Sequence, residues 1–147
     1  MIKVLHVEDD ADIREITQMA LALSGEFLVV QFKSGEEALV QVESFKPDVI
    51  LLDVVMPDMT GPQMFERMRQ MPSVANVPTV FMTARTHQND IDALLAAGAV
   101  DVISKPFDPL SLGHKIQEIL DGARRQGDEK LTVSEVIDIS ESQMGLS

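Results

Sequence analysis

The feature that most constrains the fold of this chain is an alternation, repeated five times, between short apolar runs and longer amphipathic stretches. The runs are rich in Val, Ile and Leu, which is typical of strands buried on both faces of a parallel sheet. The expected strands are residues 2–7, 27–32, 48–52, 79–82 and 100–103.

The stretches between these runs carry apolar residues three and four positions apart, the spacing of one helix face. Gly25, Pro47 and Gly98 end the first, second and fourth of these helices, and Gly61 with Pro62 opens the third. Five strand–helix units predict an α/β domain with a doubly wound parallel sheet and helices on both faces. The apolar positions that mark the helices are Ile13, Ile16, Ala20 and Leu23; Ala38, Leu39, Val42 and Phe45; Met64, Phe65 and Met68; Ile91, Leu94 and Leu95; and Leu112, Ile116, Ile119 and Leu120.

Length and composition exclude several classes of protein. The 147 residues suffice for one domain, and 12 Lys and Arg against 24 Asp and Glu give a net charge of −12. This balance argues against nucleic-acid binding through a broad basic face, because phosphates need cationic partners. The absence of cysteine excludes disulfides, zinc–thiolate sites and thiol catalysis. Without a membrane-spanning run or a signal-peptide layout, the expected location is the cytoplasm, away from membranes.

Polar residues follow four of the predicted strands, at the edge where parallel sheets bind their ligands. Clustered carboxylates repel one another unless a proton or a cation lies between them, and oxygen ligands without His or Cys suit Mg²⁺. The polar residues are Glu8, Asp9 and Asp10 after the first strand, Asp53 after the third, Thr83 after the fourth, and Ser104, Lys105 and Pro106 after the fifth.

A Mg²⁺ ion beside a carboxylate favours phosphoryl transfer. Asp53 is then the candidate nucleophile, and Thr83 and Lys105 are suitable partners for the phosphoryl oxygens. A single Asp after a strand is more commonly a turn or cap residue. The convergence of four strand ends favours the functional interpretation.

Four motifs stand at these strand ends: Val7-Glu8-Asp9-Asp10, Leu51 to Gly61, Met82-Thr83-Ala84 and Ser104-Lys105-Pro106-Phe107. Together they make the chain resemble the receiver domains of bacterial two-component response regulators. The resemblance covers residues 1–122 and implies a flavodoxin-like sheet in the order 2-1-3-4-5. It also implies a regulatory phosphoacceptor domain, which takes a phosphoryl group onto Asp53 from a sensor histidine kinase or a histidine phosphotransfer protein.

The resemblance also implies which acids bind the metal. In the family a basic residue commonly follows the second acid by five positions, and Arg14 stands at that distance from Asp9. The implied pair is therefore Glu8 and Asp9, with Asp9 binding Mg²⁺ directly and Glu8 through water. Asp10 is expected at the start of the helix, where the positive end of the dipole favours an acid.

Further roles follow from the same resemblance. Asp53 is implied as phosphoacceptor and metal ligand, and the backbone carbonyl of Val55 as another metal ligand. Thr83 is implied as the switch hydroxyl and Lys105 as the cation that pairs with phosphate. Ala84 is small and leaves the approach to the phosphate open.

Val102 departs from the residue usual in the family, and Val55 and Arg85 stand at positions that vary within it. Val102 stands where family members often carry Tyr or Phe, so we expect the Thr83 switch to act through loop and helix-four shifts. Val55 has no polar group to orient an attacking water, and Arg85 either covers the phosphate or points to solvent. The bond before Pro106 is often cis in the family, and an X-Pro sequence permits this.

Three other side chains are expected to be structural. His6 is expected in the core as a hydrogen-bonded polar group. Met56 and Met59 are expected to be partly exposed in the loop after Asp53.

Residues 123–147 are expected to be a polar tail or linker with at most one marginal helix, opening at a capping box over 132–135.

Phosphorylation is expected to change the affinity of the strand 4 to helix 5 face for a downstream protein or a second copy of the chain. One alternative is a receiver fragment whose output domain lies outside this sequence. Another is a Mg²⁺-dependent aspartyl-phosphate phosphatase, although Val55 replaces its usual second Asp. A nucleotide or flavin binder is disfavoured because the acids after the first strand would repel phosphate.

Overall fold

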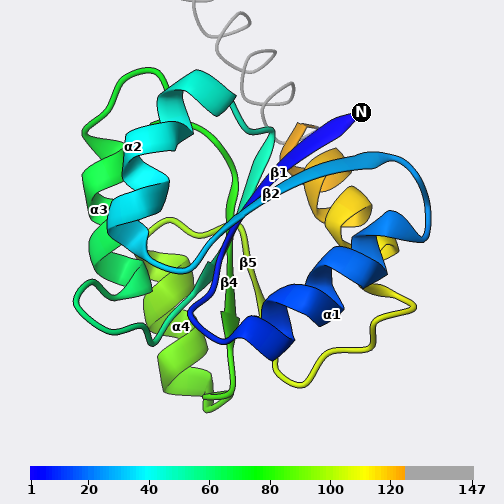
Figure 1. Cartoon of the computed structure of the whole chain (residues 1–147). Coiled ribbons are helices and arrows are strands. Elements are labelled where there is room, and N and C mark those ends of the chain that lie inside the picture. The colour runs from blue at the N-terminus through cyan, green and yellow to red at the C-terminus, as the bar shows by residue number, and fades with distance from the viewer. Residues whose placement is uncertain (125–147) are drawn as a thin grey trace, which may run out of the picture.

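The computed structural model describes residues 1–124, which form a five-stranded parallel sheet in the order β2-β1-β3-β4-β5 (Figure 1). All four strand pairs are parallel. This result confirms the predicted fold class and strand order. The strands are β1 (Ile2–Val7), β2 (Phe27–Phe32), β3 (Val49–Asp53), β4 (Thr79–Thr83) and β5 (Asp101–Ser104).

Helices cover both faces of this sheet. A fifth helix over residues 112–124 follows β5 and extends two residues past the predicted boundary at residue 122. The remainder of the predicted tail, with its proposed capping box, lies outside the described residues. No helix in the described part of the chain has both the length and the apolar character needed to cross a bilayer. The first four helices are α1 (Ala11–Ala22), α2 (Gly35–Phe45), α3 (Gly61–Arg69) and α4 (Gln88–Ala96).

Side chains alternate along each strand and so build one apolar core on each face of the sheet. Leu5 and Val7 face a core shared with α2, α3 and α4. Val4 faces a second core, shared with α1 and the helix over residues 112–124. All five residues of β3 are buried, as expected for a central parallel strand.

Two expectations about exposure are wrong. Met56 and Met59 are 5% and 4% exposed, because the loop after β3 folds inward and Met59 packs over Gly35. Ile16 and Leu23, placed among the apolar positions of the first helix, are 44% and 67% exposed, and Leu95 of the fourth helix is 41% exposed. The buried stripe of α1 is instead Thr17, Ala20 and Leu21.

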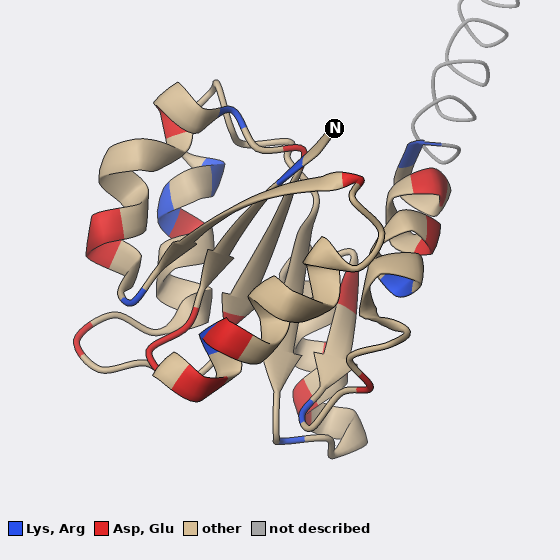
Figure 2. Ribbon diagram, turned by 45° about the vertical axis from the view of Figure 1, so that its right-hand side comes forward, with Lys and Arg blue, Asp and Glu red and all other residues tan. Residues whose placement is uncertain are grey.

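Charged groups are distributed over both helical layers. Figure 2 shows Lys and Arg scattered singly among acidic and uncharged segments of the described chain.

Candidate functional site

The polar residues that follow the strands line one pocket at the carboxyl edge of the sheet. Because parallel strands end at the same edge, groups far apart in sequence meet there. The pocket has a volume of about 320 Å³, and its lining residues are Glu8, Asp9, Asp10, Ile13, Asp53, Val55, Thr83, Ala84, Arg85 and Lys105.

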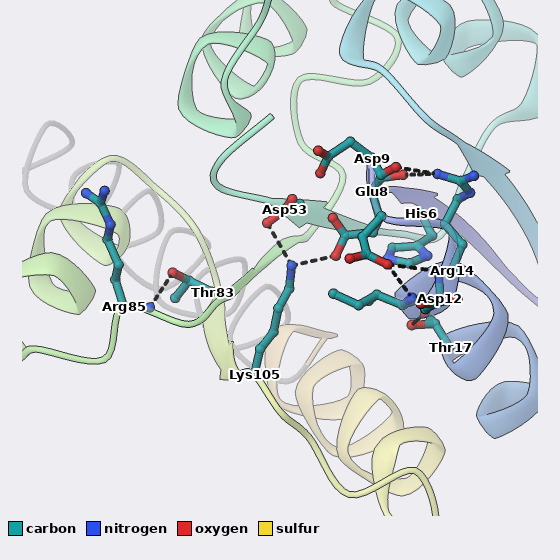
Figure 3. Close-up of polar contacts among 12 residues, drawn as sticks. His6, Glu8, Asp9, Asp12, Arg14, Thr17, Asp53, Thr83, Arg85 and Lys105 are labelled. Atoms are coloured by element: carbon teal, nitrogen blue, oxygen red, sulfur yellow. Dashed lines mark hydrogen bonds and ion pairs between the residues drawn. The ribbon is translucent and has the colours of Figure 1, made fainter. Parts of the chain in front are cut away.

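Lys105 is the centre of an ion-pair network in this pocket (Figure 3). Its Nζ lies 2.5 Å from Oε1 of Glu8 and 2.8 Å from Oδ1 of Asp53. The backbone N–H of Lys105 donates to the carbonyl oxygen of Thr83 at 2.8 Å, and the bond to Pro106 is cis. The lysine therefore neutralises part of the charge on two acids from different strands.

Glu8, Asp9 and Asp53 form a candidate cation site. Each offers a carboxylate oxygen, and these oxygens lie within 4.8 Å of one another. Glu8 and Asp53 are buried, whereas Asp9 is exposed and open to solvent. Oε2 of Glu8 is buried and has no hydrogen-bond partner among the described residues. A buried acceptor without a donor, beside two further carboxylates, suits a hard cation with oxygen ligands.

The ion-pair network shifts the pKa values of Glu8, Asp53 and Lys105 in different directions. Burial raises the pKa of Glu8, and the neighbouring Asp53 raises it further. Burial also acts to raise the pKa of Asp53, but hydrogen bonds from Glu8 and Lys105 outweigh it and leave that pKa lowered. Burial acts to lower the pKa of Lys105, but its bonds to Asp53 and Glu8 outweigh it and leave that pKa raised. Asp53 is thus held as the anion, which is the form a nucleophile needs.

The start of α1 fixes the acidic loop. Arg14 Nη1 donates to the carbonyl oxygens of Glu8 and Asp9 at 2.7 and 3.0 Å. Asp10 is the N-cap of α1, and its Oδ1 accepts from the N–H groups of Asp12 and Ile13 at 2.8 and 3.2 Å. The structure thus places Asp10 at the helix start, as the sequence predicts, and its capping oxygen is already engaged.

The loop after β3 is held tightly against Asp53 by Gly61. A Cβ at Gly61 would lie 2.2 Å from the carbonyl oxygen of Asp53, so only glycine fits without a shift of the backbone. The Gly61 N–H also donates to the carbonyl of Val54 at 3.0 Å. The side chain of Val55 is 58% exposed, and this residue lines the pocket.

Thr83 and Arg85 lie on the β4 side of the pocket. Thr83 is buried, and its Oγ1 accepts from the N–H of Arg85 at 2.9 Å. The Arg85 side chain is exposed and extends away from Lys105 and the acids (Figure 3). Ala84 is exposed at the rim of the pocket. Val102 is half-buried in β5 and packs against the core shared with α2, α3 and α4.

His6 occupies the core below the pocket, as expected, but only one of its ring nitrogens is paired. Its Nδ1 lies 3.1 Å from Nε2 of Gln31, which also donates to the carbonyl of Arg14 at 2.7 Å. Nε2 of His6 has no partner among the described residues. Burial, followed by the nearby charge of Lys105, lowers the pKa of His6 to about 3. Gln31 is not among the site residues predicted from the sequence, where its only signal is a polar residue inside an otherwise apolar strand.

Comparison with known proteins identifies a family for most of the chain. Residues 4–117 match the family described as the response regulator receiver domain. Two solved structures with the same fold also have related sequences. A putative response regulator from Chloroflexus aurantiacus superimposes with a TM-score of 0.75 at 33% identity, covering 82% of this chain and 98% of that one. The chemotaxis response regulator CheY4 of Vibrio cholerae gives a TM-score of 0.75 at 31% identity, covering 81% of this chain and 98% of that one.

Curated relatives include longer proteins. The transcriptional regulatory protein CseB of Streptomyces coelicolor is 38% identical over 117 residues, which are 80% of this chain and 48% of that protein. The DNA-binding response regulator MtrA of Mycobacterium leprae is 33% identical over 137 residues, 93% of this chain and 58% of that protein. The chain therefore spans about half the length of these relatives.

Proposed function

Because this chain belongs to the response regulator receiver family, we propose that it transmits a signal by accepting a phosphoryl group on Asp53. The observation that carries the proposal is the Lys105 ammonium, which lies 2.8 Å from Asp53 and 2.5 Å from Glu8. In such a pair the anionic carboxylate is the nucleophile, and the cation beside it offsets the negative charge of the phosphate. The donor is a phosphohistidine of a sensor kinase or of a histidine phosphotransfer protein.

In the proposed reaction a carboxylate oxygen of Asp53 attacks phosphorus. The new P–O bond forms as the P–N bond to the donor imidazole breaks, and the imidazole leaves with the bonding electron pair. The lowered pKa of Asp53 keeps the nucleophile ionised. Lys105 is placed to exchange one of its carboxylate contacts for a phosphoryl oxygen. Val55 supplies no acid–base group, which disfavours a dedicated phosphatase.

The acids beside Asp53 are the proposed ligands of Mg²⁺. Carboxylates of Asp9 and Asp53 and the backbone carbonyl of Val55 would hold the ion, with Glu8 acting through water. When bound, Mg²⁺ offsets the negative charge on the acids and on the phosphoryl oxygens. The orphan Oε2 of Glu8 and the clustered carboxylate oxygens support this assignment.

Thr83 is the proposed switch residue. Its Oγ1 accepts from the N–H of Arg85, so this hydroxyl is tied to the loop between β4 and α4. A phosphoryl group on Asp53 attracts the hydroxyl as a donor, and the loop and α4 shift with it. Val102 has no large ring to move, so the proposed coupling runs through the loop rather than through an aromatic side chain.

The downstream event is proposed to be protein binding. The face from β4 to the helix over residues 112–124 would bind a partner protein or a second copy of the chain in a phosphorylation-dependent way, in the cytoplasm. Because the relatives are about twice as long, the chain would act either alone or as the receiver part of a longer regulator. MtrA is named as DNA-binding, and an output of that kind would reside outside the receiver.

Incubation with acetyl phosphate, with and without Mg²⁺, tests the proposed acceptor by intact-protein mass spectrometry. We expect the wild type to gain one phosphoryl mass only with Mg²⁺, and Asp53→Asn to gain none. Asp58→Asn is the matched control, because it removes an acid from the same loop and Asn tolerates the positive φ of 67° there. Equal labelling of wild type and Asp53→Asn, or no labelling of wild type, would contradict the proposal.

A further inference from the structure

Two buried polar atoms of the described chain lack a hydrogen-bond partner, and both belong to the segment that ends in the acidic loop. They are Nε2 of His6 and Oε2 of Glu8. His6 is 0% exposed and Glu8 is 1% exposed, so bulk water does not solvate either atom. Buried polar atoms are rarely left unpaired, because each costs the free energy of its lost hydration. The pair therefore needs a physical explanation.

The contacts of Gln31 fix which nitrogen of His6 carries the proton. The carbonyl oxygen of Arg14 can only accept, so the Gln31 atom 2.7 Å from it must be the amide nitrogen. The same nitrogen lies 3.1 Å from Nδ1 of His6 and has a second hydrogen to donate. Nδ1 is therefore the acceptor and Nε2 carries the ring proton. The unpaired atom of His6 is a donor. That of Glu8 is an acceptor when its carboxyl is ionised, which is the form that a cation beside it favours.

His6 and Glu8 are separated by one residue, so their side chains leave the strand on the same face of the sheet. Two residues along a strand span about 6.6 Å. Two hydrogen bonds through one water span about 5.5 Å, which is within reach of two side-chain ends whose backbone positions are that far apart. Glu8 follows β1 directly, beside Asp53 at the end of β3, and His6 is completely buried.

We propose that His6 is a positioning residue for the cation site, whose Nε2–H donates to Oε2 of Glu8 through one water. Lys105 holds Oε1 of the same carboxylate, so the two donors together fix its orientation toward Asp9 and Asp53. Gln31 acts on the cation site only through His6, because its hydrogen bond to Nδ1 sets the tautomer in which Nε2 is a donor. Hydrogen bonds of this outer kind orient ligands and tune metal affinity. The inference rests on the proposed function, since it concerns the same cation site.

Two substitutions of His6 separate this role from a packing role. His6→Asn keeps a group where Nδ1 meets Gln31 but loses the donor near Nε2, whereas His6→Gln reaches the Nε2 position with an amide N–H. We expect His6→Asn to weaken Mg²⁺ binding about tenfold, and His6→Gln to restore most of it, measured by calorimetric titration with Mg²⁺ alone. Thr17→Val is the control, because it removes a buried hydroxyl of α1 that bonds only to Ile13.

The outcomes distinguish the inference from the function on which it rests. If the wild type binds no Mg²⁺, the proposed function fails and the inference with it. If the wild type binds Mg²⁺ and His6→Asn binds it equally well, the inference alone is overturned. A packing role predicts that both His6 variants lose the same stability in urea and that neither changes Mg²⁺ affinity beyond the change seen in Thr17→Val.

A measurement on the wild type avoids any folding defect of the variants. A long-range ¹H–¹⁵N correlation spectrum of the imidazole should show Nε2 protonated and Nδ1 bare, with the Nε2 resonance shifting when Mg²⁺ is added. A proton on Nδ1, or an Nε2 resonance that is unchanged at saturating Mg²⁺, would overturn the proposal.

Discussion

Replacing Gly61 by alanine should damage both the stability and the phosphorylation of this protein. The new Cβ would lie 2.2 Å from the carbonyl oxygen of Asp53 and 3.1 Å from the ring of Phe81. Backbone and a buried ring cannot yield as a flexible side chain can, so α3 must move away from β3. Overpacking of this kind costs about 1–3 kcal/mol, and loss of the bond from Gly61 to Val54 adds about 1 kcal/mol. The stiffer unfolded chain offsets roughly 0.5–1 kcal/mol, so the three contributions leave a net loss of about 1–3.5 kcal/mol.

Urea unfolding of the wild type and Gly61→Ala, with acetyl phosphate labelling at the same protein concentration, measures both effects. Gly122→Ala is the matched control, because nothing lies within 4 Å of its added Cβ. In a helix that exchange should be neutral or stabilise by up to about 1 kcal/mol. If Gly61→Ala were as stable and as readily labelled as the control, the close approach of α3 would not be what positions Asp53.

Three further predictions concern the cap, the ion pairs and the buried histidine. Asp10→Ala should cost about 1 kcal/mol in urea unfolding, because two N–H groups of α1 lose their acceptor; an unchanged midpoint would contradict this role. Lys105→Met should lose more stability at pH 8 than at pH 5. Without the ammonium the pKa values of Glu8 and Asp53 rise, and the protonation that relieves repulsion between these two acids is more complete at the lower pH. Equal losses would show that the pairing is unimportant. Between pH 6.5 and about 4.5 the unfolded state protonates His6 while the folded state, with its pKa near 3, does not. The contribution of His6 to stability should therefore decrease as the pH is lowered through that window, by on the order of 2 kcal/mol. Glu8, whose pKa is raised in the folded state, contributes in the opposite direction. The difference in unfolding free energy between the wild type and His6→Gln, from urea titrations at each pH, isolates the His6 part and should change by that amount.

The fold could be predicted from the sequence because periodicity alone distinguishes its elements. The buried strand β3 carries a continuous apolar run from Val49 to Leu52, and the predicted bounds of β1 and β3 agree with the structure to within one residue. The exposure of single side chains was harder to predict. Ile16 and Leu23 fit a helical stripe, yet the face that packs on the sheet is centred on Thr17 and Leu21. Met56 and Met59 are buried because Gly35, distant in sequence, leaves room for Met59.

The candidate site was also predictable in part. Each of its strand-end residues follows an apolar run, and the parallel topology brings those ends together. The ion pairs of Lys105 with Glu8 and Asp53 depend on side-chain conformations that no local pattern specifies. The contact of His6 with Gln31 was even harder to predict, because a single amide group there connects β1, β2 and α1. Sequence patterns indicate which residues meet at the sheet edge, and packing decides which atoms pair.

The central claim is that Glu8, Asp9, Asp53, Thr83 and Lys105 serve one cation-dependent phosphoacceptor site. A crystal structure of the protein with Mg²⁺ and beryllofluoride, a mimic of the phosphoryl group, tests it most directly. The account predicts the mimic on Asp53, with Lys105 and the Thr83 hydroxyl against its fluorines. It also predicts the ion at about 2.0–2.1 Å from oxygens of Asp9, Asp53 and Val55. An ion bound elsewhere, or a mimic attached to a different carboxylate, would contradict the account.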